Sequence, residues 1–351
     1  MNIKQSSFGY LANGREVFLF SLTNDAGMQV NIINYGAIIT GILVPDRHGT
    51  LADVVLGFDN LQQYVEDKNY IGAAIGRYAN RIGLARFELD GRLHQLDRND
   101  GKNHLHGGRG GFHKVLWDAR TEVQENSVSV TLSYLSLHGD QGYPGNLAVQ
   151  IRYQLNQHNE LIVSYHATTD RATPVNLTQH SYFNLAGHGD ILGHKLLINA
   201  DAYTPVNREL LPNARHEKVA LTPFDFRTSE TIGARITAKD EQLHFGSGYD
   251  HNYVLNKSVL NQLELAALVF SPSSGRQLEI LTQEPGLQFY SGNFLNGEFT
   301  GKGRGFSHRS AFCLEPQHFP DSPNSPTFPS TVLQVGEQYS TNTVYRFSVQ
   351  P

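Results

Sequence analysis

Two ionisable side chains lie in sequence surroundings that suit proton transfer. His180 stands in Thr-Gln-His-Ser-Tyr-Phe, where hydroxyl, amide and aromatic neighbours can tune the pKa of an imidazole that acts as a general acid. An isolated histidine is more often structural. Glu315 ends the apolar run Ala-Phe-Cys-Leu, and partial desolvation there would raise the pKa of its carboxyl and strengthen it as a base. The alternative for Glu315 is a salt-bridged residue at a rim.

A pair of histidines raises the question of a metal site. The segment 103–108 reads Asn-His-Leu-His-Gly-Gly, and in an extended chain His104 and His106 would point to the same face. The residues that follow contain no carboxylate, which disfavours a metal. They also lack Gly-Lys-Ser/Thr, which disfavours a phosphate loop. We predict instead that the glycines let the backbone approach a ligand, with His106 facing it.

Three further segments carry groups that hydrogen-bond to hydroxyls. Segment 76–81, Gly-Arg-Tyr-Ala-Asn-Arg, supplies planar guanidinium donors, although an exposed turn with ion pairs is the alternative. Asp250 opens an apolar strand, where it can accept from sugar hydroxyls or cap a turn. Segment 284–294 combines Gln288 with phenylalanine and tyrosine rings, whose faces suit the apolar faces of pyranose rings.

Strands are the elements expected to position these groups. Period-two alternation, which places one face on a core and the other toward water, favours antiparallel sheets. It occurs in Ser127–Tyr134, Val149–Leu155, Leu161–Thr168, Gln277–Thr282 and Thr343–Val349. Asn13-Gly14, Asp90-Gly91 and Asp100-Gly101 suit tight turns. We therefore predict an all-β fold.

Other elements are few. Asn60–Val65 and Ser229–Ile236 are the candidates for short helices. Pro316–Pro329 holds five prolines, which predicts an ordered irregular loop rather than a strand. No linker, fixed repeat or low-complexity tract divides the chain, so residues 1–351 are expected to form a single domain.

Composition excludes several classes of function. The formal net charge of −5 provides no positive field for nucleic acid or anionic lipid. The single cysteine, Cys313, excludes an internal disulfide and a thiolate zinc cluster, and is expected to be a small core residue. No apolar leader or membrane-length apolar run is present, so we expect a cytoplasmic protein that does not bind membranes.

Six segments together resemble the aldose 1-epimerase (galactose mutarotase) family, in the same order and from Asn34 to the C-terminus. They are GRYANR, NHLHGG, QHSYFNL, YDHNYVL, QFYSGNF and LEPQHFPDSPN. The resemblance implies a large antiparallel β-sandwich with an open cleft. It also implies an isomerase that interconverts the anomers of galactose, and of glucose, without cofactor or metal. We expect a monomer or weak homodimer whose partner is a small aldose.

The resemblance assigns roles by position. His180 would be the general acid and Glu315 the general base. The sugar site would be lined by Asn80, Arg81, His106, Asp250 and Gln288, with Ser181 and Tyr182 beside the acid. Arg77 is less secure, because the family's binding arginine matches the second arginine of GRYANR. The glycine-rich stretch Asn296–Ser310 has no assigned role.

The implied chemistry is short. Glu315 would take the proton of the anomeric hydroxyl, His180 would protonate the ring oxygen, and His106 would hydrogen-bond that oxygen as charge develops. We then expect kcat/KM to be bell-shaped, with an acidic limb from Glu315 and an alkaline limb from His180.

Three rivals stay open at this point. A non-catalytic sugar-binding module would need no apposed acid and base. A glycoside hydrolase could use Asp250 and Glu315. A sugar-phosphate mutarotase would need a basic cluster, and no segment provides a clear one. The preferred aldose is also open, because galactose and glucose differ in the direction of one hydroxyl.

Overall fold

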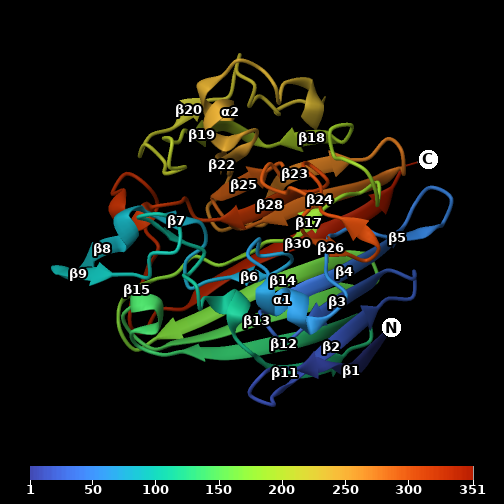
Figure 1. Ribbon diagram of the computed structural model, residues 1–351, viewed down its shortest axis with the longest axis horizontal. Helices are drawn as coiled ribbons and strands as arrows, with labels where there is room; N and C mark the ends of the chain where they lie inside the picture. Colours follow the sequence, from blue (N-terminus) through green and yellow to red (C-terminus); the bar gives the residue numbers. More distant parts are fainter. Residues whose placement is uncertain (351) are drawn as a thin grey trace.

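The computed structural model describes residues 1–350, and most of its regular structure is β-strand (Figure 1). The largest sheet has nine antiparallel strands in the order β11-β12-β13-β14-β30-β24-β23-β18-β21. They are β11 (Asp118–Val123), β12 (Ser127–Ser136), β13 (Leu147–Asn156), β14 (Glu160–Thr169), β18 (Lys195–Ile198), β21 (Glu230–Thr231), β23 (Glu264–Phe270), β24 (Arg276–Thr282) and β30 (Tyr339–Val349). All five alternating segments lie in this sheet, so these strand predictions are confirmed.

Alternation explains how this sheet packs. In β13, Leu147, Val149, Ile151, Tyr153 and Leu155 are buried, and the residues between them are exposed or half-buried. The buried face packs against a five-stranded antiparallel sheet of β1 (Asn2–Tyr10), β2 (Glu16–Thr23), β3 (Gln29–Ile33), β4 (Ile38–Pro45) and β5 (Leu51–Asp53). In Figure 1 these N-terminal strands (blue) lie beside β11 to β13 (green).

A six-stranded antiparallel sheet completes the core. Its order is β17-β28-β25-β22-β19-β20, formed by β17 (Tyr182–Phe183), β28 (Phe312–Gln317), β25 (Gly286–Tyr290), β22 (Asp250–Leu255), β19 (Ala200–Thr204) and β20 (Glu217–Lys218). Phe312 and Leu314 of β28 join the apolar cluster that all three sheets share. Because side chains alternate along a strand, Cys313 and Glu315 project from the opposite face. Stacked sheets around one core confirm the predicted β-sandwich.

Five short two-stranded sheets and two short helices complete the regular structure of the described residues. The two-stranded sheets join β7 (Arg81–Ile82) with β10 (His104–Leu105), β6 (Ala74–Ile75) with β16 (Thr178–Gln179), β8 (Arg86–Leu89) with β9 (Arg92–Gln95), β15 (Thr173–Pro174) with β29 (Val332–Leu333), and β26 (Thr300–Gly301) with β27 (Arg304–Gly305). The helices are α1 (Leu61–Glu66) and α2 (Glu241–Gly246). Within residues 1–350, neither helix has the length and apolar character needed to cross a bilayer.

The helix predictions were partly right. Asn60 caps α1 by accepting from the N–H of Gln63, which confirms the helix expected at Asn60–Val65. Ser229–Ile236 was expected to hold a single helical turn. Ile232–Ala234 form one 3₁₀ turn there, and the residues before it form the short strand β21. Pairing of β21 with β18 at the edge of the large sheet keeps Glu230 and Thr231 extended, so the turn begins only at Ile232.

The proline-rich stretch begins later than predicted. Pro316 and Gln317 belong to β28, opposite Leu287 and Gly286 of β25. β17 pairs only with Phe312 and Cys313. Beyond Cys313 that side of β28 is therefore an edge, where a missing N–H disrupts no ladder. Glu315 consequently lies inside a strand, not at the boundary of a loop.

Candidate active site

A cavity of about 160 Å³ opens on the face of the six-stranded sheet that is turned away from the core. Strands β17, β22, β25 and β28 provide one wall, and loops near residues 70, 80 and 106 provide the other. It is lined by Lys68, Asn69, Tyr70, Asn80, Arg81, Leu105, His106, His180, Tyr182, Asp250, Gln288, Tyr290, Phe294 and Glu315. Every predicted site residue except Ser181 is in this lining.

Cross-strand register gathers three polar side chains in the cavity. Asn252 of β22 stands opposite Gln288 of β25, and Gln288 stands opposite Glu315 of β28. Asp250 lies two residues before Asn252 and therefore projects from the same face. The amide Nε2 of Gln288 donates to Oδ1 of Asp250 at 2.7 Å. Antiparallel pairing thus brings residues from three distant segments into one wall.

Two acceptor atoms in this wall have no hydrogen-bond partner among the described residues. They are Oε2 of Glu315 and Oε1 of Gln288, both buried. Buried polar atoms are rarely left unpaired in folded proteins. Such acceptors can receive hydrogen bonds from hydroxyl groups, and a sugar carries several of these.

His180 and Glu315 meet directly. The Nε2 atom of His180 lies 3.7 Å from Oε2 of Glu315, and the two side chains are 7% and 2% exposed. Aromatic rings enclose the imidazole: the centroid of Tyr182 is 5.0 Å away and that of Tyr70 is 6.0 Å away. The arrangement places a potential proton donor and a potential acceptor side by side, with both side chains almost fully buried.

Burial sets the protonation of this pair. Desolvation lowers the pKa of His180 to about 4. Desolvation, reinforced by the negative charge of Asp250, raises the pKa of Glu315 well above its usual range. In both cases burial disfavours the charged form, which is the imidazolium of His180 and the carboxylate of Glu315. The histidine therefore has the lower pKa of the two. The acidic limb of the pH profile is then assigned to His180 and the alkaline limb to Glu315, the reverse of the order expected from the sequence.

His106 is held in one tautomer. Its Nδ1 accepts the backbone N–H of Asn80 at 3.1 Å, so the neutral ring carries its proton on Nε2 and presents a donor. The ligand atoms of His106, His180 and Glu315 all lie within 4.8 Å of one another. Metal ligation through Nε2 would move the proton to Nδ1, against the N–H of Asn80. This donor set therefore fits a hydrogen bond to substrate better than a metal ion.

The prediction that His104 and His106 point to the same face of an extended chain is wrong. His106 has a positive φ of 51°, so the chain is not extended there. The Nδ1 atom of His104 lies 2.7 Å from the carbonyl oxygen of Asp97, and its Nε2 lies 2.8 Å from the hydroxyl of Tyr143. His104 is thus a fully buried structural residue outside the cavity.

Arg77 is also structural. Only 2% of it is exposed, and its guanidinium donates to the carbonyl of Pro144 at 2.8 Å and to the hydroxyl of Ser136 at 2.7 Å. Arg81, by contrast, lines the cavity and donates through Nε to Asp100 at 2.8 Å. The second arginine of the motif is therefore the one beside the cavity. Ser181 is buried and does not line it.

Several lining residues were not predicted individually. They are Lys68, Asn69, Tyr70, Leu105, Tyr290 and Phe294. Tyr290 and Phe294 lie in the aromatic segment 284–294, where sequence reasoning expected rings for a pyranose without choosing among them. The loop of Lys68 to Tyr70 carries no motif, and only its packing against His106, with ring centroids 4.6 Å apart for Tyr70, places it at the site.

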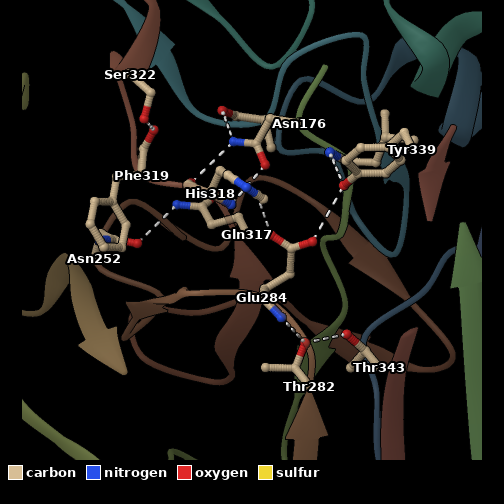
Figure 2. Close-up of polar contacts among 12 residues, drawn as sticks. Asn176, Asn252, Thr282, Glu284, Gln317, His318, Phe319, Ser322, Tyr339 and Thr343 are labelled. Atoms are coloured by element: carbon tan, nitrogen blue, oxygen red, sulfur yellow. Dashed lines mark hydrogen bonds and ion pairs between the residues drawn. The ribbon is translucent and has the colours of Figure 1, made fainter. Parts of the chain in front are cut away.

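An ion pair between buried Glu284 and half-buried His318 supports the chain just beyond Glu315 (Figure 2). The Nδ1 atom of His318 lies 2.6 Å from Oε2 of Glu284. The backbone N–H of His318 donates to Oδ1 of Asn176 at 2.9 Å, and Nδ2 of Asn176 donates to the carbonyl of His318 at 3.1 Å. Asn176 precedes His180 by four residues. The network thereby joins the segment that carries His180 to the strand that carries Glu315.

Replacing Glu284 by Gln should lower the free energy of unfolding by about 1.5–3 kcal/mol, the usual contribution of a hydrogen bond to a charged group. Burial opposes ionisation of both partners, but the pair raises the pKa of His318 and lowers that of Glu284. The His318 contribution is lost as pH rises through its folded pKa, and the Glu284 contribution as pH falls through its own. The difference should therefore be largest between the ordinary values of 4.5 and 6.5.

Urea unfolding of the wild type and of Glu284→Gln, near pH 5.5 and near pH 9, tests this. Glu279→Gln is a suitable control, because its partner Arg346 is 43% exposed. Equal stability of Glu284→Gln and wild type near pH 5.5 would show that the pair contributes nothing.

Comparison with known proteins finds similarity to aldose 1-epimerases over nearly the whole chain. The family model for aldose 1-epimerase matches residues 19–346. Galactose mutarotase of Bos taurus is 44% identical over 353 aligned residues, which cover 99% of each chain. Aldose 1-epimerase of Escherichia coli (strain K12) is 38% identical over 338 residues, 95% of this chain and 96% of that one. The solved structure of galactose 1-epimerase from Lactobacillus acidophilus superposes with a TM-score of 0.87 at 29% identity, covering 100% of both chains.

Proposed function

Because the chain belongs to the aldose 1-epimerase family, we propose that it interconverts the α and β anomers of galactose, and of glucose, by opening and reclosing the pyranose ring. The observation that carries this proposal is the approach of His180 Nε2 to Glu315 Oε2, 3.7 Å apart in a buried cavity with unpaired acceptors. An acid and a base at one point are what the reaction requires.

The reaction needs two coupled proton transfers. Glu315 takes the proton of the anomeric hydroxyl while His180 delivers a proton from Nε2 to the ring oxygen. The bond between C1 and the ring oxygen breaks as the aldehyde forms. Rotation about the C1–C2 bond turns the other face of the carbonyl toward that oxygen, and reversal of both transfers closes the second anomer. No electrons are lost and no covalent adduct forms.

The remaining side chains orient the sugar. The Nε2–H of His106 donates to the ring oxygen as charge develops there. Asp250 and Gln288, joined to each other at 2.7 Å, receive hydroxyls along the sheet wall, while Asn80 and Arg81 bind them from the opposite side. Because binding already fixes the orientation of the sugar, less entropy is lost on reaching the transition state, and the activation barrier is lower. Tyr182 encloses the acid from β17.

The apposed acid and base favour catalysis over mere binding, since a lectin has no use for a buried carboxylic acid beside an imidazole. A phosphorylated sugar would need several free cations. Within the described lining the cations are Lys68 and Arg81, and Arg81 is paired with Asp100. The site therefore suits an uncharged aldose.

Polarimetry tests the proposal. Freshly dissolved α-galactose and α-glucose should reach anomeric equilibrium faster with the protein than in matched buffer, while an aryl galactoside should stay intact. Hydrolysis of the aryl galactoside would point to a glycosidase. Binding of galactose without faster equilibration would point to a sugar-binding module.

We also expect activity to survive exhaustive treatment with EDTA. The Asn80 N–H holds His106 as a donor through Nε2, and both proton transfers proceed through side chains alone. The measurement compares kcat before and after dialysis against the chelator, with Zn²⁺ added back as a control. Loss of activity that one particular metal restores would mean that His106, His180 and Glu315 hold an ion.

A further inference from the structure

One strand contacts both nitrogens of the same imidazole. Cys313 and Glu315 are two residues apart in β28 and project from the same face. The Sγ atom of Cys313 lies 3.5 Å from Nδ1 of His180, and Oε2 of Glu315 lies 3.7 Å from Nε2. Residues spaced in this way are roughly 6.6 Å apart along a strand, enough to place one side chain at each end of the ring.

We propose that Cys313 is a positioning residue for His180, whose thiol holds Nδ1 so that Nε2 faces Glu315 and the ring oxygen of the sugar. The inference rests on the proposed role of His180 as the acid. It extends that role to a side chain that the sequence indicates only as a small core residue. Cys313 is 0% exposed, and it stands opposite Tyr182 in the register of β17 and β28.

The chemistry of a thiol suits this position. The transferred proton leaves and returns at Nε2, so Nδ1 keeps its own proton throughout, and the weakly accepting sulfur can receive that N–H before and after the transfer. A carboxylate there would stabilise the imidazolium and weaken it as an acid. Burial, with the negative charges of Glu315 and Asp250, raises the pKa of Cys313 well above its usual range. The thiol therefore stays neutral while His180 cycles between its two forms.

Other ionisable groups also face the imidazole, and the test has to hold them constant. They are Glu315 on β28, Tyr182 on β17, Tyr70 and His106 on the opposite wall, and His113 behind Tyr70. Substitutions at Cys313 leave all of them in place.

Two variants separate positioning from packing. With Cys313→Ala, kcat should fall by about tenfold or more with KM changed by less than about twofold, because a misplaced acid affects the transition state. Cys313→Ser should recover most of kcat, since a hydroxyl can again contact Nδ1. If Cys313 served only the core, the order would reverse, because a buried hydroxyl costs more than a methyl group. Leu314→Val, on the opposite face of β28, is the matched control and should keep wild-type kinetics.

A second readout does not depend on turnover. In protein labelled with ¹⁵N at histidine, the Nδ1 resonance of His180, identified by its loss in His180→Asn, should shift in Cys313→Ala and return toward the wild-type position in Cys313→Ser. Unchanged Nδ1 resonances and pH titrations in both variants would overturn the proposal, as would Cys313→Ala being at least as active as Cys313→Ser. Absence of mutarotation in the wild type would refute the proposed function, and the resonances would still decide whether the thiol holds His180.

Discussion

Replacing Glu315 by Gln is expected to lower kcat by ~10²–10⁴, the usual contribution of a positioned base, while the fold stays intact. The amide has the size of the carboxyl but cannot accept the anomeric proton. Stability should stay equal or rise. Burial raises the pKa of Glu315, so the folded state holds this proton more tightly than the unfolded chain, and stability falls as pH rises from the ordinary value toward the folded pKa. The variant removes that loss.

The measurement is polarimetric kcat together with thermal unfolding near pH 5 and near pH 8. Any gain in melting temperature should be larger near pH 8, because unfolding then allows the buried wild-type carboxyl to ionise, whereas the amide cannot ionise in either state. Glu122→Gln, half-exposed on β11, should change neither quantity appreciably. Near-normal turnover in folded Glu315→Gln would transfer the role of base to another carboxylate, and Asp250 is the one in the cavity.

Replacing His180 by Asn should lower kcat by a similar factor and change the form of the pH profile. In the wild type the active pair shares one proton, carried either on Nε2 or on Oε2, and these forms are in equilibrium across 3.7 Å. The pair gains a second proton as pH falls through the pKa of His180, about 4, and loses its last as pH rises through the raised pKa of Glu315. The kcat/KM profile is therefore a bell with its acidic limb from His180.

Without His180, the residual activity depends on the Glu315 carboxylate alone. It should rise with pH through the folded pKa of Glu315 and then level off, with no alkaline limb. In Glu315→Gln the converse holds: residual activity needs the imidazolium and should decline as pH rises from about 4. The experiment records kcat/KM against pH for all three proteins, with the buffer-catalysed rate subtracted. A His180→Asn profile that keeps the wild-type bell would mean that His106 donates the proton.

Local sequence was sufficient to predict the fold class. Period-two alternation in β12, β13, β14, β24 and β30 is a property of neighbouring residues, and it identifies a half-buried strand wherever that strand pairs. The two-residue strands and α2 were not predictable in this way. The six residues of α2, capped by Asp240, are too few to show a helical period in the sequence. A helix this short is stabilised mainly by its tertiary contacts.

The chemical types of the site residues were also present in the sequence. Taken singly, His180 and Glu315 were more typical of structural residues, and it was the resemblance of six ordered motifs to the aldose 1-epimerase family that implied acid–base chemistry on a sugar. Every predicted site residue but Ser181 lines one cavity. Residue types and motif order are carried by the chain itself, so they could be assigned before any distance was known. The roles stay predictions until the variants are measured.

Only the tertiary structure decided which atoms meet. Cys313 and His180 are 133 residues apart, and their contact arises from the register of β17 with β28. A positive φ at His106 separates it from His104, and burial turns Arg77 from a ligand candidate into a structural residue. Burial also inverts the order of the acid and base pKa values. Register and desolvation depend on strands that are distant in sequence but adjacent in space, and local pattern contains no information about either.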